Sequence, residues 1–290
     1  MNDDTTEIKL RTPSIPQNGV MLSVDVEDYF MSPETIAFAD WPKFESAIHR
    51  GMEKTLALFD RFGAKATFFF VAWLADRYPE LVRWTVERGH EIGSHSYTHN
   101  YIHQMEPREF EATLEKSLAI LQPLAGEQPI IGFRAPAFSL DRKKEWQFSI
   151  LKKRGFRYDS SIIPVQTYLY GDRTAPRHPY WIGDLFEIPP ATIEIAGWRQ
   201  PVGGGGTLRL YPAWFTTWAR RRYQAEGYPP VIYLHPWELV PDHPPIPLPF
   251  KQRFMHYAGI RSMESKLAKL LQSNHTLTLG DYWRRVMDDQ

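Results

Sequence analysis

The chain has 290 residues, a length that one large α/β domain can account for. Its 34 Lys and Arg balance 34 Asp and Glu, so nothing in the charge indicates a nucleic-acid partner or a polyanionic substrate. The absence of cysteine excludes disulfides, thiolate metal ligands and a cysteine nucleophile. Any metal site must therefore use His, Asp or Glu side chains.

The first 18 residues are polar and acidic, and we expect them to form a disordered tail. They lack the basic and apolar regions of a secretion signal, and no run of about 18 apolar residues occurs in the chain. These patterns predict a cytoplasmic protein without a transmembrane segment. The basic run Arg220-Arg221-Arg222 fits a solvated helix face better than a phosphate or membrane contact.

Apolar runs and helical spacing alternate from residue 20 onward. The predicted strands are residues 20–26, 66–72, 91–94, 130–134, 156–159 and 231–234, with two more within the irregular segment 164–212, at 185–188 and 192–195. The predicted helices are residues 45–62, 79–88, 107–124, 141–154, 213–226 and 261–271. This alternation predicts a parallel sheet with helices outside it, and catalytic side chains just after the strands.

The first predicted strand ends in the run Asp25-Val26-Glu27-Asp28, which holds three carboxylates. Their mutual repulsion favours a bound cation or raised pKa values. An exposed turn with capping carboxylates is the alternative, and this run does not decide between them.

Two histidines follow the third predicted strand. His95 and His99 are four residues apart, which would place both imidazoles on one side of a helical turn. Neutral imidazole is a good ligand for zinc and neighbouring divalent metals. We interpret the nearby His90 and His103 as structural.

Single polar residues follow three later strands. Arg134 could bind a carboxylate through two parallel hydrogen bonds. Asp159 ends the fifth strand, and His235 follows an apolar run directly before Pro236, a suitable place for a general acid. A surface arginine and a packed core histidine are the alternatives.

The order of these features resembles the polysaccharide deacetylases, also called the NodB-homology family or carbohydrate esterase family four. The similarity extends from about residue 20 to residue 239, and the Asp-Val-Glu-Asp start resembles exopolysaccharide-associated and peptidoglycan-type members. It implies an α/β fold, a distorted (β/α) barrel of about seven strands. It also implies one catalytic domain over residues 19–290, with a helical extension at about residues 250–290.

The resemblance implies one divalent metal ion, with zinc the first choice and cobalt, nickel or iron as alternatives. Its ligands would be His95, His99 and one carboxylate, with Glu27 slightly preferred over Asp28 because Val26 replaces the usual ligand. The implied catalytic residues are the base, the arginine that orients it, the general acid and the aspartate that tunes the acid: Asp25, Arg134, His235 and Asp159.

The resemblance also suggests substrate contacts. The backbone N–H of Ala137 would stabilise an oxyanion. Ser160 and Ser161 follow Asp159 in place of the family's aromatic residue, so the acetyl pocket would be lined by Tyr97, Trp237 or Trp181. Tyr168 and Tyr170 are further candidates for stacking on a sugar ring.

The implied activity is removal of N-acetyl groups from the amino sugars of a bacterial polysaccharide or glycan precursor. A small-molecule amidohydrolase, resembling an allantoinase or a deformylase, is the second hypothesis. An inactive carbohydrate-binding scaffold protein is the third. Polysaccharide-assembly proteins are possible partners, and the sequence leaves the oligomeric state open.

Overall fold

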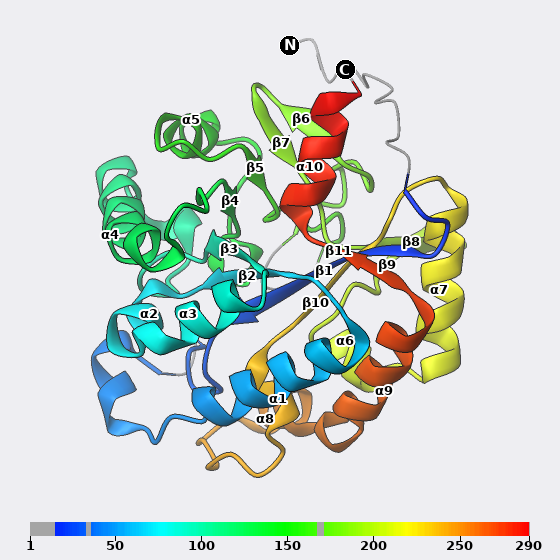
Figure 1. Cartoon of the computed structure of the whole chain (residues 1–290), viewed down its shortest axis with the longest axis horizontal. Coiled ribbons are helices and arrows are strands. Elements are labelled where there is room, and N and C mark those ends of the chain that lie inside the picture. The colour runs from blue at the N-terminus through cyan, green and yellow to red at the C-terminus, as the bar shows by residue number, and fades with distance from the viewer. Residues whose placement is uncertain (1–14, 33–35, 167–170, 290) are drawn as a thin grey trace.

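A curled sheet forms the centre of the molecule. The computed structural model describes residues 15–32, 36–166 and 171–289 (Figure 1). Seven parallel strands of this described part lie side by side in the order β10 (Val231–Leu234), β1 (Gly19–Val26), β2 (Thr67–Phe70), β3 (Glu91–Ser94), β4 (Gly132–Phe133), β5 (Tyr158–Asp159) and β7 (Leu185–Glu187). The antiparallel β6 (Tyr180–Ile182) lies beyond β7.

The chain beyond β7 returns to the opposite edge of the sheet. The Ala191 N–H donates to Val231 O at 3.2 Å, and Gly204 forms a parallel bridge with Tyr233. A separate hairpin, β8 (Thr192–Ile195) with β9 (Trp198–Pro201), lies between these two contacts in the sequence. The expected distorted (β/α) barrel is therefore confirmed.

Helices surround the sheet, most of them joining consecutive strands. They are α1 (Ile48–Phe62), α2 (Ala72–Arg77), α3 (Pro79–Glu87), α4 (Pro107–Ala125), α5 (Glu145–Lys153), α6 (Gly206–Leu210), α7 (Ala213–Ala225), α8 (Phe250–Tyr257), α9 (Ile260–Ser273) and α10 (Leu279–Asp288). Short 3₁₀ turns are η1 (Phe38–Lys43), η2 (Ile102–Gln104), η3 (Pro136–Phe138) and η4 (Pro236–Leu239). Within the described residues, no helix combines the length and the apolar character needed to cross a membrane.

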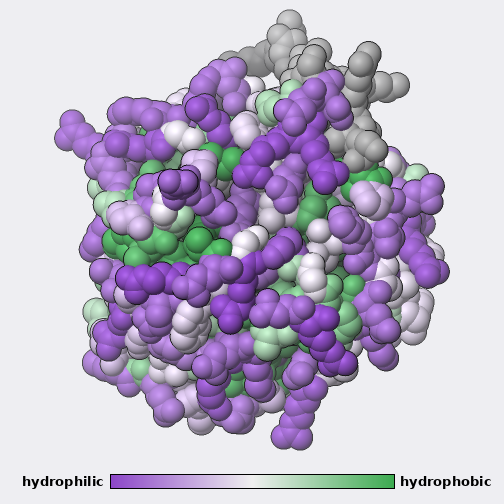
Figure 2. Space-filling view, viewed as in Figure 1, coloured by the Kyte–Doolittle hydropathy of each residue, from purple (hydrophilic) through white to green (hydrophobic). Residues whose placement is uncertain are grey.

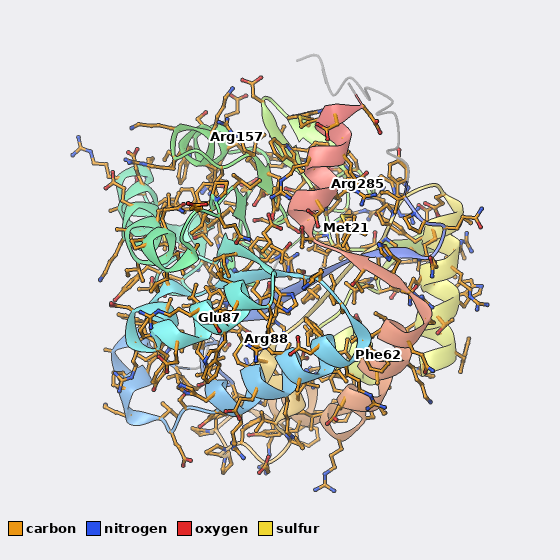
Figure 3. All side chains as sticks on the ribbon, viewed as in Figure 1. Met21, Phe62, Glu87, Arg88, Arg157 and Arg285 are labelled. Atoms are coloured by element: carbon orange, nitrogen blue, oxygen red, sulfur yellow. The ribbon has the colours of Figure 1, made fainter. Side chains whose placement is uncertain are left out.

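The core follows from the apolar patterns in the sequence. Every residue of β1 is buried, as expected for a central strand covered on both faces. Helix α10 covers the end of the barrel where β1 begins, and Figure 3 shows Met21 near this helix. Met21 packs there in one cluster with Leu279 and Tyr282. The outer face seen in Figure 2 is mostly hydrophilic, with hydrophobic residues visible between the helices.

The C-terminal region is more than a set of added helices. A short strand, β11 (His275–Leu277), pairs in parallel with the start of β1. Helices α8, α9 and α10 are present, but β11 ties this region to the central sheet. Residues 1–14 of the expected tail lie outside the described residues, and the division into a tail and one domain stays a prediction.

A close helix contact positions η4 beside the sheet. An added Cβ at Gly51 of α1 would lie 2.7 Å from the backbone of Pro236, so only glycine allows this approach. Because Pro236 follows His235 directly, the packing of α1 helps to fix the backbone that presents this histidine.

Candidate active site

Glu27, His95 and His99 converge at the carboxyl edge of the sheet. Glu27 follows β1, whereas the two histidines follow β3. One potential ligand atom of each residue lies within 4.8 Å of those of the other two. Glu27 Oε2 is 2.6 Å from His99 Nε2, and both histidines are buried. The structure thus brings together the residues predicted to hold a metal.

The path from His95 to His99 differs from the helical turn expected from their spacing. Residues 95–99 form no helix, and Ser96 has a φ of 66° in the left-handed region. The backbone therefore departs from helical geometry directly after β3. The tertiary structure, and not a local helix, brings the two rings within 5.0 Å of each other.

The protonation states of His95 and Glu27 suit a metal ion. His95 Nδ1 lies 2.7 Å from the carbonyl oxygen of Arg134, which can only accept, so Nδ1 carries the proton and Nε2 keeps its lone pair. Burial, reinforced by His99, holds the pKa of His95 well below its ordinary value, so this ring is neutral. Burial opposes ionisation of Glu27, but His99 and His235 outweigh it and lower its pKa. Two imidazoles and one carboxylate fit a divalent ion such as zinc.

Asp28 lies in a different network. Its carboxylate accepts hydrogen bonds from Ser46 Oγ at 2.6 Å and from the Ala47 N–H at 3.1 Å, just before α1 begins. Asp28 also accepts a hydrogen bond from the Tyr29 N–H. The geometry therefore favours Glu27 over Asp28 as the metal ligand.

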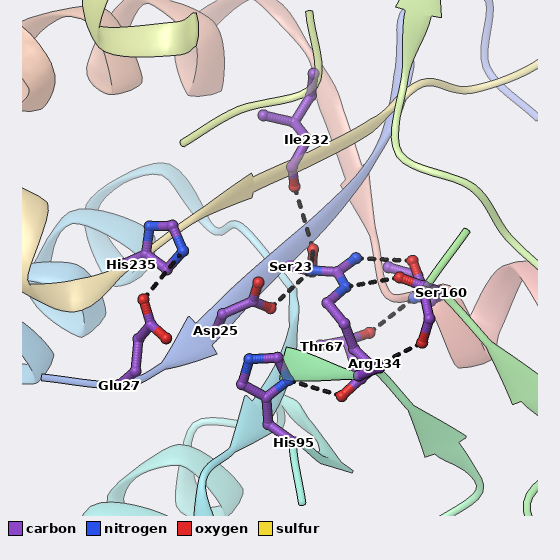
Figure 4. Close-up of polar contacts among 12 residues, drawn as sticks. Ser23, Asp25, Glu27, Thr67, His95, Arg134, Ser160, Ile232 and His235 are labelled. Atoms are coloured by element: carbon purple, nitrogen blue, oxygen red, sulfur yellow. Dashed lines mark hydrogen bonds and ion pairs between the residues drawn. The ribbon is translucent and has the colours of Figure 1, made fainter. Parts of the chain in front are cut away.

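Arg134 fixes the carboxylate of Asp25. Arg134 is fully buried, and its Nη1 donates to Asp25 Oδ1 at 2.7 Å and to Ser23 Oγ at 2.9 Å. The rest of the guanidinium donates to the backbone oxygen and side chain of Ser160. Figure 4 shows Asp25 between Arg134 and the Glu27–His235 pair. With its donors engaged in this way, Arg134 holds Asp25 in one orientation.

His235 approaches the cluster from β10, on the other side of β1 from β2. Its Nε2 lies 3.4 Å from Glu27 Oε1, and its ring stacks on Trp237. Nδ1 lies 3.2 Å from Glu238 Oε2, as an ion pair. Burial alone would lower the pKa of His235, but Glu27 and Glu238 outweigh it and raise the pKa to about 9. A protonated imidazole at this position can act as a general acid.

Glu238 and Arg209 are functional candidates that the sequence analysis missed. The fully buried Glu238 accepts a hydrogen bond from the His235 N–H at 2.9 Å and another from Arg209 Nε at 2.6 Å. Burial opposes its ionisation, but His235 and Arg209 together lower its pKa to about 2. The signal in the sequence was a Glu three residues after His235, the spacing with which a side chain returns to a helix start.

Asp159 does not contact His235. It accepts a hydrogen bond from Ser161 Oγ and lies against Glu187, where burial raises the pKa of both carboxyl groups. Such a close buried pair favours one shared proton. The position predicted for Asp159, beside the general acid, is held by Glu238, because β5 and β10 are separated in the sheet by four strands.

The expected substrate contacts are only partly at the site. Trp237 is stacked between His235 and His256, and Ala137 follows Arg134 with a φ of 49°. The Ala137 amide has no hydrogen-bond partner among the described residues, which leaves it available to an oxyanion.

The other aromatic candidates are placed differently. Tyr97 packs edge-on against Phe38, with Lys116 Nζ 3.6 Å from its ring centre. Trp181 packs on Phe186, in a cluster that contains Leu279 and Tyr282 of α10 and none of the other candidate site residues. Tyr168 and Tyr170 lie outside the described residues.

The fold and the histidine–carboxylate cluster define an α/β-barrel protein with a candidate metal site. A family model described as polysaccharide deacetylase matches residues 35–158, and one described as a domain of unknown function (DUF3473) matches residues 160–284. The first of these matches covers less than half of the chain, so residues 35–158 are similar to the polysaccharide deacetylases, whereas the model that matches residues 160–284 names no function.

The curated relatives match part of this chain. The peptidoglycan deacetylase of Helicobacter pylori is 29% identical over 159 residues, which cover 52% of this chain and 48% of that protein. The peptidoglycan deacetylase-like protein FGM2 of Gibberella zeae is 31% identical over 122 residues, or 41% of this chain and 35% of that protein. The chain thus spans half or less of the length of these relatives.

Solved structures share the fold over nearly the whole chain. A Mycobacterium smegmatis protein assigned to the polysaccharide deacetylases has a TM-score of 0.64 at 20% identity, covering 96% of this chain and 94% of its own. Puue allantoinase has a TM-score of 0.58 at 18% identity, covering 93% and 90%. At these identities the similarity establishes the fold alone.

Proposed function

We propose that this protein is a metal-dependent deacetylase that hydrolyses the N-acetyl groups of amino sugars in a polysaccharide or glycan precursor. The observation that carries the proposal is the convergence of three elements at one edge of the barrel. These are the Glu27, His95 and His99 cluster, the Asp25–Arg134 pair and the His235–Glu238 pair. Each supplies one function that amide hydrolysis needs: an electrophile, a base and an acid.

The chemistry follows from the positions of the side chains. A divalent ion held by Glu27, His95 and His99 would polarise the amide carbonyl and lower the pKa of a bound water. Asp25, held by Arg134, accepts a proton as water attacks the carbonyl carbon. The Ala137 N–H donates to the developing oxyanion, a contact type worth about 3–4 kcal/mol in comparable sites.

His235 completes the reaction. As the C–N bond breaks, His235 donates a proton to the sugar nitrogen, which leaves as an amine while acetate remains. An unprotonated nitrogen would be far too basic to leave. Glu238 stabilises the protonated ring, and Arg209 in turn holds Glu238. Asp25 and His235 lie on the same side of the sheet edge, so one amide could contact both.

The proposed function is tested by measuring amine release. We expect acetate and free amine from N-acetylated oligosaccharides, including peptidoglycan fragments, and loss of this activity with a chelator followed by recovery when zinc is added. Hydrolysis of allantoin or of a formamide without sugar deacetylation would contradict the proposal and favour a small-molecule amidohydrolase. Inactivity on every substrate with metal bound would favour a scaffold protein.

Substituting Glu238 with glutamine should shift the alkaline limit of activity. His235 must carry its proton, so activity is high below its pKa and falls as pH rises through that value. Removing the Glu238 charge should lower this pKa by about one unit or more. The pH profile of kcat would show the change, with the alkaline limb moving to lower pH.

A matched control is available in the same chain. Glu226 pairs with His178, Oε2 to Nε2 at 2.8 Å, away from the candidate site. The Glu226→Gln variant removes the same charge from a histidine partner and should keep the wild-type pH profile. An unchanged alkaline limb in Glu238→Gln, or an equal shift in Glu226→Gln, would contradict the role of Glu238.

A further inference from the structure

Helix α7 carries a stripe of exposed aromatic and basic side chains. Trp214 and Trp218 are 71% and 41% exposed, one helical turn apart, and Arg221 and Arg222 extend the same side of the helix. The opposite side is buried against the hairpin β8–β9 through residues that include Ala219 and Tyr223. We refer to Trp214, Trp218, Arg221 and Arg222 as the α7 stripe.

Neighbouring side chains contact the exposed aromatic rings of the α7 stripe. Phe215 contacts both tryptophans, with ring centres 5.8 Å from Trp214 and 5.6 Å from Trp218. The guanidinium of Arg222 lies 5.7 Å from the centre of the Trp218 ring. These contacts hold large apolar side chains at the surface, although side chains of this kind are usually buried.

Two adjoining grooves make this surface strongly basic. The α7 stripe, with Ala213 and Thr217, lines a shallow groove of about 590 Å³. A smaller groove shares Ala213 and Thr217 and reaches α9, where Lys266 and Lys269 line it. Neither groove is lined by any acidic side chain among the described residues.

The charge of this surface contrasts with that of the whole chain. Helix α7 contains three arginines and no Asp or Glu, although the full chain has zero net charge. Of the three, Arg220 is buried and donates to Asn274 Oδ1, so Arg221 and Arg222 are the ones that face solvent. Surface charge of one sign implies a partner of the opposite sign.

The basic run alone favours a solvated helix face, but the exposed tryptophans and adjoining lysines change that interpretation. We propose that the α7 stripe docks this protein on the surface of an anionic lipid membrane. Tryptophan partitions to the boundary between lipid headgroups and acyl chains, and arginine pairs with lipid phosphates. A helix with exposed tryptophans and adjacent basic residues has the composition of an interfacial helix. The helix lies on the bilayer surface, and the proposal requires no membrane-spanning segment.

Vesicle co-sedimentation tests the proposal. We expect the purified protein to bind vesicles of phosphatidylcholine with phosphatidylglycerol and to bind pure phosphatidylcholine vesicles much more weakly. The double variant Arg221→Glu/Arg222→Glu should bind the anionic vesicles at least about tenfold more weakly. Trp214→Ser/Trp218→Ser should also weaken binding, since it removes the interfacial anchors.

The control carries the same charge change on another side of the molecule. Arg108 on α4 and Arg157 before β5 are both exposed, and Figure 3 shows Arg157 far from α7. Arg108→Glu/Arg157→Glu should keep the binding of the wild-type protein. All variants should melt at similar temperatures and keep their activity on a soluble substrate.

Three outcomes would overturn the proposal. The first is wild-type binding that does not depend on phosphatidylglycerol, and the second is an equal loss of binding in the control variant. The third is evidence that the α7 stripe binds a partner other than a membrane. In that case the α7 variants would change the mass measured by light scattering, or the binding of an anionic polysaccharide, without changing vesicle binding.

Discussion

Substituting His95 with alanine is expected to remove metal binding and activity together. His95 is one of the three proposed ligands, and no other group of His, Asp or Glu among the described residues forms a comparable cluster. Its hydrogen bond from Nδ1 to Arg134 O fixes the ring so that Nε2 is free to bind. Metal content of the purified variant, measured by elemental analysis after dialysis against zinc, should be near zero. Amine release should fall to the level of chelator-treated wild-type protein.

His103 provides the control for this substitution. It is an exposed histidine in the same segment, stacked on Tyr101 and outside the cluster. His103→Ala should keep stoichiometric metal and full activity. A His95→Ala protein with one tightly bound zinc and wild-type turnover would disprove the assignment of the ligands.

Substituting Asp25 with asparagine should abolish most turnover while leaving the metal in place. Asparagine keeps the size of the side chain and one oxygen for Arg134, but it cannot accept a proton from water. Loss of a general base slows catalysis by about 100- to 10,000-fold. Single-turnover kinetics on zinc-loaded protein should show this decrease in the chemical step, with little change in KM.

Asp28 offers a matched comparison three residues away. Its carboxylate bonds to Ser46 and Ala47 and not to the cluster, so Asp28→Asn should retain turnover and lose only stability. The pair of variants therefore separates a catalytic from a structural carboxylate in the same short run. Equal turnover in both variants would exclude Asp25 as the base.

The fold was largely predictable because its strands are buried and its helices are amphipathic. Apolar runs predicted β1, β2 and β10, whose residues are buried. Helical spacing predicted α1, whose apolar residues Ile48, Met52, Leu56 and Phe59 are buried. The strand β11 could not be predicted in the same way. Its three residues form a strand by pairing with β1, which lies more than 250 residues earlier in the chain.

The candidate site was predictable where polar residues directly follow strands. The carboxyl ends of parallel strands meet at one edge, and this rule brought Asp25, Glu27, His95 and His235 together. The mode of contact was less predictable. The spacing of His95 and His99 suggested a helical turn, whereas residues 95–99 form no helix and Ser96 has a left-handed backbone conformation.

The partner of His235 was missed because it depends on tertiary structure. Asp159 was the expected partner, but the sheet order places β5 far from β10. Glu238 reaches back over one 3₁₀ turn, and Arg209 arrives from α6 to neutralise it. The packing of Trp181 on Phe186 was also not predictable, because an aromatic residue in a hydrophobic cluster and one at a binding site look the same in a sequence.

The most direct test of the central claim is a diffraction measurement on zinc-loaded crystals at wavelengths on either side of the zinc absorption edge. We expect one anomalous peak at full occupancy, within bonding distance of a Glu27 carboxylate oxygen and of the Nε2 atoms of His95 and His99. A map without that peak, or with zinc bound only to other side chains, would contradict the account.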